Sequence, residues 1–412
     1  MLSNQRKRAA EALRSLRRRP EIAALARAAA RRGVDAWIVG GAIRDRLLGL
    51  HPGEVDVAVA RDVERIAEDL ERAGMGRAVF LSRGRPGPRV FRIAGARPFD
   101  AAEIEGGSIV TDLRRRDFTV NALALSLPSG ELFDPHGGLA DVAARRLRSV
   151  RPENIAEDPL RILRAARLLA TRSLRPDRGV LAASRAAAES FMRVAPERVA
   201  AELAKLLEAP RAAPALTWTA RAGILPAALG LPIAPGRVLA VARSLAALDD
   251  ASVRRLRPGR RRRLRLAGLA LRLRLPAGRT RAWLAERRWG RDEARDAAHL
   301  VELVERSRRT VSREEAWEWI LDAGPLLDDA LALLERRGEV ARRRARRLRT
   351  LARSRGRPVA VSGRDVVHWL GIPEGPRVGE LLRAVRVAAA MGTISGRRAA
   401  RDWLVGQVRK AM

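Results

Sequence analysis

Hydrophobic and polar positions follow two different patterns along the chain, and the pattern changes near residue 150. Before that point, short β-rich runs alternate with helical stretches and glycine-rich turns. Apolar runs bounded by turn residues predict strands, here at 36–39, 55–60, 89–94 and 118–127. From Pro159 onward, a repeating Leu/Ala/Arg pattern broken by proline and glycine predicts consecutive helices. We therefore expect an α+β protein, with a mixed head followed by an all-α remainder.

The length and charge of the chain add a domain count and a first partner. A chain of 412 residues is too long for one ordinary core, so we expect about two to four domains. Lys and Arg number 82 against 47 Asp and Glu, and the net charge of +35 attracts polyanions, nucleic acid first among them. Nearly all of this charge is arginine, which a biased genome composition would explain equally well. Two arginine-dense stretches, 254–274 and 342–357, fit either a phosphate-binding surface or a solvated helix face.

Cysteine content and hydrophobicity exclude several classes of protein. The absence of cysteine rules out disulfides and thiolate metal sites, and it suits a reducing compartment. No stretch approaches the roughly 18 uninterrupted apolar residues of a transmembrane helix, and the basic start lacks the apolar core of a secretory signal. We expect a cytoplasmic protein with no membrane partner and with a solvated basic helix or arm at its start.

The first candidate site is the run WIVGGAIRDRLLG at residues 37–49. An apolar strand that runs into Gly40 and Gly41 and then a helix can bring backbone N–H groups against a phosphate. Arg44, less than one turn into that helix, can add a charge-assisted fork to the same phosphate. A tight turn without any ligand is the structural alternative for such a glycine pair.

Acidic residues follow closely in the run EVDVAV at residues 54–59. Residues two apart in a strand point to the same side, so Glu54 and Asp56 can hold a divalent metal while Val55 and Val57 enter the core. A strand with one solvated face would look the same. Two-metal phosphoryl chemistry needs a further carboxylate from a neighbouring strand, and Asp100 is the candidate.

The segment DLRRRDFTVNALAL at residues 112–125 packs several charges directly before a β-like run. Arginines beside a triphosphate stabilise the charge that builds on a leaving pyrophosphate, and Arg114, Arg115 and Arg116 stand together here. Asp117 follows them, and the Asn121 amide can orient a sugar or a loop. An ordinary basic loop is equally compatible with this composition.

The last candidate site is ENIAEDPLRILRAARLLA at residues 153–170. Asp158 before Pro159 has the pattern of a helix N-cap with proline at the first helical position. Helical periodicity places Arg161, Arg164 and Arg167 on one stripe opposite an apolar face. An Asp acceptor beside Arg donors can pair with the polar edge of a base and so distinguish nucleotides without a template.

Together these blocks resemble the class II tRNA nucleotidyltransferase and bacterial poly(A) polymerase family. They stand in the family's order over residues 37–207, and a weaker block, VSGRDVVHWLGIPEGPRVGELLRAV, resembles the tail of long bacterial members. Residues 211–355 carry little that matches. The blocks are GGAIRDRLLG with the downstream acids, RRDFTVNAL, FDPHGGLADVAARRLR, EDPLRILRAAR and PERVAAELAKLL.

The resemblance implies a polymerase-β-type nucleotidyltransferase head followed by an all-α neck, body and tail, with the tail contacting tRNA. We place the boundaries as follows: a basic N-terminal arm at 1–20, the head at 21–148, the neck at 149–210, the body at 211–350 and the tail at 351–412.

The resemblance also implies roles for the candidate residues. Glu54 and Asp56 would hold Mg²⁺ in a two-metal site, and Asp100 would be the third acid near the primer hydroxyl. Asp158 and Arg161 would imitate a template base. The expected nucleotide-binding set is Gly40, Gly41, Arg44, Arg116, Asp117, Asn121, Asp158, Arg161, Arg164 and Arg167.

The expected reaction is addition of C and A nucleotides to the 3′ end of tRNA from CTP and ATP. The RNA 3′ hydroxyl attacks the α-phosphate in line, and pyrophosphate leaves. A poly(A) polymerase or an enzyme that adds only CC or only A shares the same head motifs. A non-catalytic RNA-binding relative is a further alternative, and the oligomeric state is left open.

Two departures from the family pattern bear on efficiency and nucleotide repertoire. Glu54 stands where the family usually has Asp, so its carboxylate lies one methylene further out. Glu105 stands where the family usually has Arg, which reverses a charge beside the loop. None of the histidines is followed by Asp, so the metal-dependent phosphohydrolase domain of some relatives is not expected.

Overall fold

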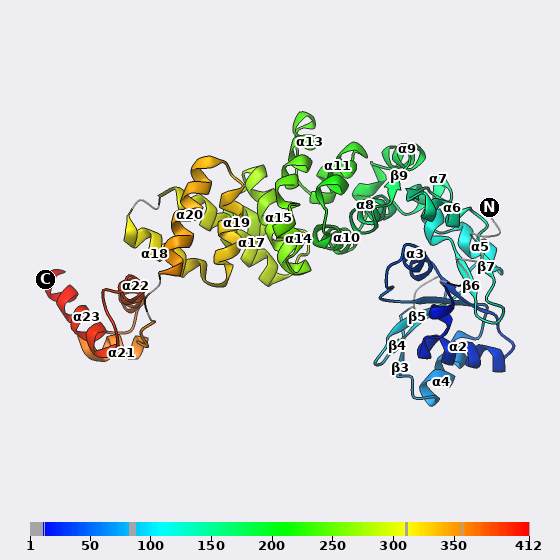
Figure 1. The fold of residues 1–412 in the computed structure, drawn as a ribbon, viewed down its shortest axis with the longest axis horizontal. Helices are drawn as coiled ribbons and strands as arrows, with labels where there is room; N and C mark the ends of the chain where they lie inside the picture. Colours follow the sequence, from blue (N-terminus) through cyan, green and yellow to red (C-terminus); the bar gives the residue numbers. More distant parts are fainter. Residues whose placement is uncertain are drawn as a thin grey trace. The chain divides into compact units, whose positions relative to one another are not determined.

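The computed structural model describes residues 11, 13–81, 88–309, 312–354, 356 and 358–411. The chain forms two compact units (Figure 1). The first unit comprises residues 1–206 and 214–239, and the second comprises residues 207–213 and 240–412. Residues 1–10 and 12 of the predicted N-terminal arm lie outside the described part of the chain.

A seven-stranded mixed sheet organises the first unit, in the order β3-β4-β5-β2-β1-β6-β7. Only β2 and β5 pair in parallel, and every other neighbour pair is antiparallel. A two-stranded parallel ribbon joins β8 to β9. The strands are β1 (Ala36–Val39), β2 (Asp56–Val59), β3 (Arg77–Phe80), β4 (Val90–Ala94), β5 (Phe99–Glu103), β6 (Ala124–Ser126), β7 (Leu132–Phe133), β8 (Arg146–Leu147) and β9 (Arg175–Pro176).

Helices lie before, between and after the strands of the first unit, and they continue through the second unit. Those that begin before residue 235 are α2 (Pro20–Arg31), α3 (Gly41–Leu47), α4 (Val63–Arg72), α5 (Ile109–Arg114), η1 (Thr119–Asn121), α6 (Gly138–Ala143), α7 (Pro152–Glu157), α8 (Leu160–Arg172), α9 (Arg178–Ala186), η2 (Ser190–Arg193), α10 (Pro196–Glu208), α11 (Ala213–Arg221) and α12 (Leu225–Leu229). The expected α+β class is confirmed. None of the helices among the described residues is long and apolar enough to cross a membrane.

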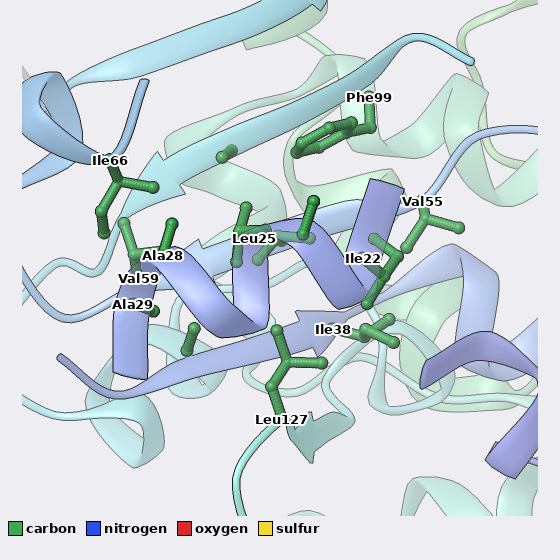
Figure 2. Packing of buried hydrophobic residues seen from close by; sticks show 14 of the residues in the cluster. Ile22, Leu25, Ala28, Ala29, Ile38, Val55, Val59, Ile66, Phe99 and Leu127 are labelled. Carbon is green, nitrogen blue, oxygen red and sulfur yellow. The ribbon is translucent and has the colours of Figure 1, made fainter. Parts of the chain in front are cut away.

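The two faces of the sheet are covered differently because strand side chains alternate. Helices α2 and α4 pack on one face, where Figure 2 shows Ile22 and Leu25 of α2 among strand residues such as Ile38 and Val55. A smaller apolar cluster with α5 covers part of the opposite face. Asp56 and Asp100 alternate with core residues of the first face, so they belong to the face that carries α5.

Two expectations for the first unit need correction. The run 118–127 is not one strand, because the chain turns through η1 before β6 begins at Ala124. The Asp117 carboxylate accepts the Phe118 N–H at 2.8 Å, and such side-chain capping favours a turn over a ladder. Residues 13–17 of the predicted arm are helical, and Leu13 and Leu16 are buried in the head core while Arg14 and Ser15 are exposed, so this part of the arm is solvated on one side only.

All the regular secondary structure in the described part of the second unit is helical. Its helices are α13 (Pro235–Ser244), which begins in the first unit, η3 (Leu245–Leu248), α14 (Ala251–Arg254), α15 (Pro258–Leu273), α16 (Ala277–Glu286), α17 (Arg291–Arg306), η4 (Ser307–Arg309), α18 (Arg313–Ala323), η5 (Gly324–Leu326), α19 (Leu327–Glu335), α20 (Glu339–Arg353), α21 (Gly363–Leu370), α22 (Pro376–Ala390) and α23 (Arg397–Ala411). The last three helices share an apolar cluster of their own. The predicted boundary at residue 350 falls inside α20, so that helix continues past it.

A buried arginine holds the start of the second unit together. The Arg265 side chain is fully buried, and its guanidinium forms an ion pair with Asp249. It also donates to four backbone carbonyls, those of Leu207, Ala209, Pro210 and Leu248. The Arg265 guanidinium therefore acts as a clamp on carbonyls within and just after the last turn of α10, where a helix leaves acceptors unpaired.

Replacing Arg265 with Met is expected to lower the free energy of unfolding of the second unit by about 3–5 kcal/mol, because Asp249 and the carbonyls lose their buried donor. Arg281→Met, at an exposed position of α16, should change it by less than about 0.5 kcal/mol. Urea titration followed by tryptophan fluorescence measures both, and equal stability of the two variants would refute the clamp. The fluorescence reports this unit through its buried tryptophans Trp283, Trp317 and Trp319.

Candidate functional site

A polar cleft of about 670 Å³ opens beside the glycine turn of the first unit. All the residues of the predicted catalytic, metal-binding and nucleotide-binding sets except Asp100 line it: Gly40, Gly41, Arg44, Glu54, Asp56, Arg116, Asp117, Asn121, Asp158, Arg161, Arg164 and Arg167. Arg115, one of the arginines expected beside the leaving pyrophosphate, lines it too, whereas Arg114 does not. The other lining residues are Ala42, Asp45, Gly53, Asp112, Arg172 and Lys205. Basic side chains outnumber acidic ones in this lining, so the cleft favours an anionic ligand.

The glycine turn forms the wall of the cleft at the start of α3. Gly40 has φ +72°, and a Cβ at this residue would lie 2.9 Å from Nη1 of Arg116. Glycine is required here by both the backbone conformation and this close approach. The Gly40 N–H donates to the Leu123 carbonyl at 3.1 Å, so it is engaged in the fold and not directed at a ligand. The N–H of Gly41 belongs to the first turn of α3, which offers it no acceptor within the helix.

The two predicted metal ligands both line the cleft but differ in local structure. Strand β2 begins at Asp56, where its pairing with Val39 of β1 starts, so Glu54 lies in the bend before the strand and not within it. Burial raises the pKa of Asp56, repulsion from Asp100 adds to the effect, and the charge of Arg116 opposes it. Asp56 therefore carries a negative charge that its surroundings do not fully compensate.

Asp100 lies beside Asp56 in the sheet but faces a different partner. The two residues are register neighbours across the parallel β2–β5 pair. Arg92 of β4 grips Asp100 with two hydrogen bonds of 2.6 and 2.9 Å, and this contact raises the pKa of Arg92. In the described part of the chain, no three His, Asp or Glu side chains gather closely enough to hold a metal ion. Glu54, Asp56 and Asp100 therefore do not form the expected three-carboxylate metal site in this structure.

The arginine stripe of α8 faces the cleft as helical periodicity predicts. Arg161 donates to the backbone carbonyls of Asn154 at 2.8 Å and of Arg115 at 3.0 Å. Arg167 donates to the buried Glu202 of α10 at 2.7 Å. Helix α8 begins at Leu160, one residue later than an Asp158 N-cap implies, although Asp158 still accepts the Leu160 N–H at 3.3 Å.

Arg164 reaches the head through a buried acid. Its Nε donates to Oδ2 of Asp117 at 2.8 Å, and Oδ1 of Asp117 accepts the Asn121 amide at 2.9 Å. Burial alone would raise the pKa of Asp117, but the charge of Arg164 and the hydrogen bonds outweigh it, so this pKa is lowered. The charge of Asp117 in turn raises the pKa of Arg164. Asp117 therefore positions Arg164 and is itself buried.

A second buried acid, Asp45, completes the connection between head and helix. Arg172 from the end of α8 donates to both Asp45 oxygens at 2.8 Å, and Arg44 donates to Oδ1 at 2.6 and 2.8 Å. Arg44 also donates to Oδ1 of Asn121. Burial raises the pKa of Asp45, yet the Arg172 hydrogen bond and the Arg44 charge outweigh it and lower the pKa overall. The buried circuit runs through Arg172, Asp45, Arg44, Asn121, Asp117 and Arg164.

Several residues that contact the predicted site residues were not themselves predicted to belong to the site. Arg198 of α10 donates to Asp158 at 2.9 Å, and it belongs to the PERVAAELAKLL block that marks the resemblance. Glu105 forms an ion pair with Arg115 at the rim, so the reversed charge has a partner in the cleft lining. Asp45 directly follows Arg44 in the glycine motif, and this adjacency is the sequence feature that could have predicted its place in the site.

Comparison with known proteins gives matches in sequence and in structure. The family model described as poly A polymerase head domain matches residues 36–148. The CC-adding tRNA nucleotidyltransferase of Geobacter sulfurreducens is 33% identical over 406 residues, which covers 90% of this chain and 92% of that protein. The CCA-adding enzyme of Geobacillus stearothermophilus is 30% identical over 410 residues, which covers 89% of this chain and 91% of that enzyme.

Solved structures match over nearly the whole chain. The Bacillus stearothermophilus CCA-adding enzyme in complex with CTP superposes with a TM-score of 0.72 at 25% identity, covering 95% of this chain and 99% of that one. The Thermotoga maritima CCA-adding enzyme complexed with tRNA-CCA has a TM-score of 0.67 at 19% identity, covering 93% and 94%. The second likeness is one of fold alone.

Asp45→Asn is expected to lower the free energy of unfolding at pH 7 by about 3 kcal/mol, since the buried Arg44 and the half-buried Arg172 lose their carboxylate. The lowered pKa of Asp45 fixes the pH dependence: its contribution is complete above the unfolded value of about 3.9 and is lost as pH falls through the folded pKa. The difference between wild type and variant should therefore shrink below about pH 4. Urea unfolding at several pH values measures it, with the exposed Asp35→Asn as control, and a difference independent of pH would contradict the assignment.

Proposed function

The chain belongs to the family of tRNA nucleotidyltransferases that add CC or CCA, and we propose that it adds C and A nucleotides to the 3′ end of tRNA from CTP and ATP without a template. The two relatives compared above match it over about nine-tenths of their length.

One observation carries the proposal: the glycine turn, the predicted metal ligands Glu54 and Asp56, and the arginine stripe of α8 line the same cleft. The turn, the acids and the arginine helix come from separate segments of the sequence, so their convergence is a property of the fold. A nucleoside triphosphate needs basic groups for its phosphates, acids for a divalent cation and polar groups for its base. The cleft offers all three.

We infer that Glu54 and Asp56 would hold Mg²⁺, because carboxylate oxygens are its preferred protein ligands. The raised pKa of Asp56 fits this role, since the crowded negative charge beside Asp100 is relieved by a cation. Asp100 would then divide its carboxylate between Arg92 and the ion. When bound, the ion supplies Lewis-acid stabilisation of the charge on the reacting oxygens.

The reaction is an in-line displacement at phosphorus. The terminal 3′ hydroxyl of the RNA gives up its proton to solvent as its oxygen forms a bond to the α-phosphorus, the bond from that phosphorus to the bridging oxygen breaks, and pyrophosphate carries away the electron pair. Arg116 and Arg164 face the cleft and stabilise the charge that develops on the leaving group. Because Asp117 fixes Arg164 in advance, little reorganisation is needed at that side chain when charge appears.

Base selection falls to Asp158 and Arg161 at the start of α8. Each engages only part of its capacity within the protein: Asp158 accepts from Arg198 and Leu160, and Arg161 donates to two carbonyls. A guanidinium has five N–H donors and a carboxylate about four acceptor sites, so both retain groups for the edge of a base. We propose that they read C and A in this way.

The nucleotide repertoire has a second candidate with support of its own. A CC-adding and a CCA-adding relative match this chain to nearly the same extent, at 33% and 30% identity. We therefore keep CC addition alone beside full CCA addition. Poly(A) addition shares the head and is a third outcome of the same experiment.

We also infer that the helical body and tail contact tRNA and that the protein acts in the cytoplasm.

Purified protein incubated with a tRNA transcript that lacks CCA is expected to extend it to CCA with CTP and ATP together. CTP alone should stop the product at CC, and ATP alone should give no extension of this substrate. Sequencing gels of the 3′ end resolve these products. A product that ends in CC even with ATP present would assign the CC-adding activity, and a long A tail on oligo(A) would assign poly(A) addition.

Asp56→Ala and Glu54→Ala are each expected to reduce incorporation by about 10³-fold or more, because the cation loses a ligand beside the reacting phosphate. The affinity for tRNA should change little, and the exposed Asp35→Ala should behave as wild type. Single-turnover incorporation and filter binding measure the two quantities. Full incorporation by both variants would remove the metal assignment, whereas a wild type that binds RNA in EDTA and incorporates nothing would favour the non-catalytic alternative.

A further inference from the structure

The second unit contains a hollow of about 920 Å³ that is separate in sequence from the nucleotide cleft. Helices α15, α17 and α19 pack against one another (Figure 1). Residues of these helices line the hollow together with residues of η3 and η4. Its apolar part is formed by leucines, among them Leu248 and Leu333. Its charged part is formed by five arginines and one acid: Arg272, Arg274, Arg308, Arg336, Arg337 and Glu305.

The arginines of this hollow are mostly unpaired, unlike their neighbours on the same helix. Earlier in α15, Arg260 and Arg263 pair with the buried Asp329, and Arg262 pairs with two glutamates. Much of the arginine-dense stretch at 254–274 is thus internal structure. Its last two arginines, Arg272 and Arg274, are exposed at the hollow and have neither an ion pair nor a side-chain hydrogen bond to another described residue.

The other side of the hollow repeats this arrangement. Arg308 and Arg337 are exposed there, and no described acid lies within ion-pair distance of either. Burial lowers the pKa of Arg337, the charge of Arg308 lowers it further, and Glu305 only partly opposes them. Arg336 differs, because Asp250 and the Ala247 carbonyl hold it. Four guanidiniums from three segments therefore surround one hollow, and Glu305 is the one acid in its lining.

The lining also indicates which part of an anionic polymer fits. None of the lining residues is aromatic, Asn or Gln, so a base would find neither a stacking platform nor an amide to pair with. Guanidinium forks match phosphate oxygens regardless of sequence. The hollow is several times larger than one phosphate group. These features select a stretch of backbone over a nucleobase or a free nucleoside.

We propose that this hollow binds the phosphodiester backbone of the RNA substrate away from its 3′ end. The inference rests on the proposed function, because it assigns a second contact to the same RNA. Binding there would be independent of base sequence and would depend strongly on salt, since each neutralised phosphate releases counterions. The contact would affect how RNA is held and not how the nucleotide reacts.

The test replaces Arg272 and Arg308 by Ala, singly and together, and measures the Kd for a tRNA transcript that lacks CCA over a range of salt. Each single change should weaken binding about fivefold near 0.1 M salt and lower the log–log salt slope by about 0.9, and the double change by about twice that. Arg308→Lys should restore part of the affinity. Neither side chain has a described partner, so the melting temperature should stay near that of wild type.

Arg295→Ala is the matched control, because it removes the same charge from α17 at a guanidinium that Asp292 and Asp296 already neutralise. A short single-stranded primer should be extended equally by wild type and by every variant, since the defect concerns RNA held beyond the 3′ end. If Arg272→Ala and Arg308→Ala bind tRNA like Arg295→Ala while wild type is active, the hollow is not an RNA site. If wild type extends neither substrate, the proposed function fails instead.

Discussion

A circuit of hydrogen-bonded side chains built on two buried acids, Asp45 and Asp117, connects helix α8 to the head, and its members line the cleft. The circuit leaves α8 at Arg172, passes through the acids and amide of the head, and returns to α8 at Arg164. Buried charges are costly unless they are paired and hydrogen-bonded. A different position of α8 against the head would leave Asp45 and Asp117 without their arginine partners, so the observed position is strongly favoured. A helix held at two points along its length keeps the side chains between them in a fixed orientation.

The sheet contributes the second constraint, which is register. In a sheet that is otherwise antiparallel, the single parallel pair of β2 and β5 brings Asp56 and Asp100 side by side on one face. The antiparallel neighbour β4 then places Arg92 opposite Asp100 on that face. Register therefore creates both the acidic pair and the arginine that competes for it. The charge of Asp100 is therefore shared between repulsion from Asp56 and attraction to Arg92.

Periodic features of the site could be predicted from the sequence, whereas pairings between distant segments could not. The stripe of Arg161, Arg164 and Arg167 follows from helical repeat alone, and strand 36–39 follows from its continuous apolar run. The run 118–127 was predicted wrongly because a local side-chain hydrogen bond, invisible to periodicity, turns the chain. The partners of Asp45 and Asp100 lie in other elements, and composition gives no signal for such contacts. For the same reason, charge density alone could not separate structural arginines from exposed ones.

The path of the chain between the two units has a practical consequence for dissecting the protein. The chain leaves the first unit after residue 206, returns at 214 and leaves again after 239. A fragment cut near residue 210, where a sequence-based design would end a catalytic piece, omits helices α11 and α12 from the unit that it aims to isolate. Such a fragment would expose apolar surface that α11 and α12 bury in the intact chain, and would be prone to aggregate. Subcloning of the catalytic half is better ended after residue 239, so that α11 and α12 stay with the unit that they complete.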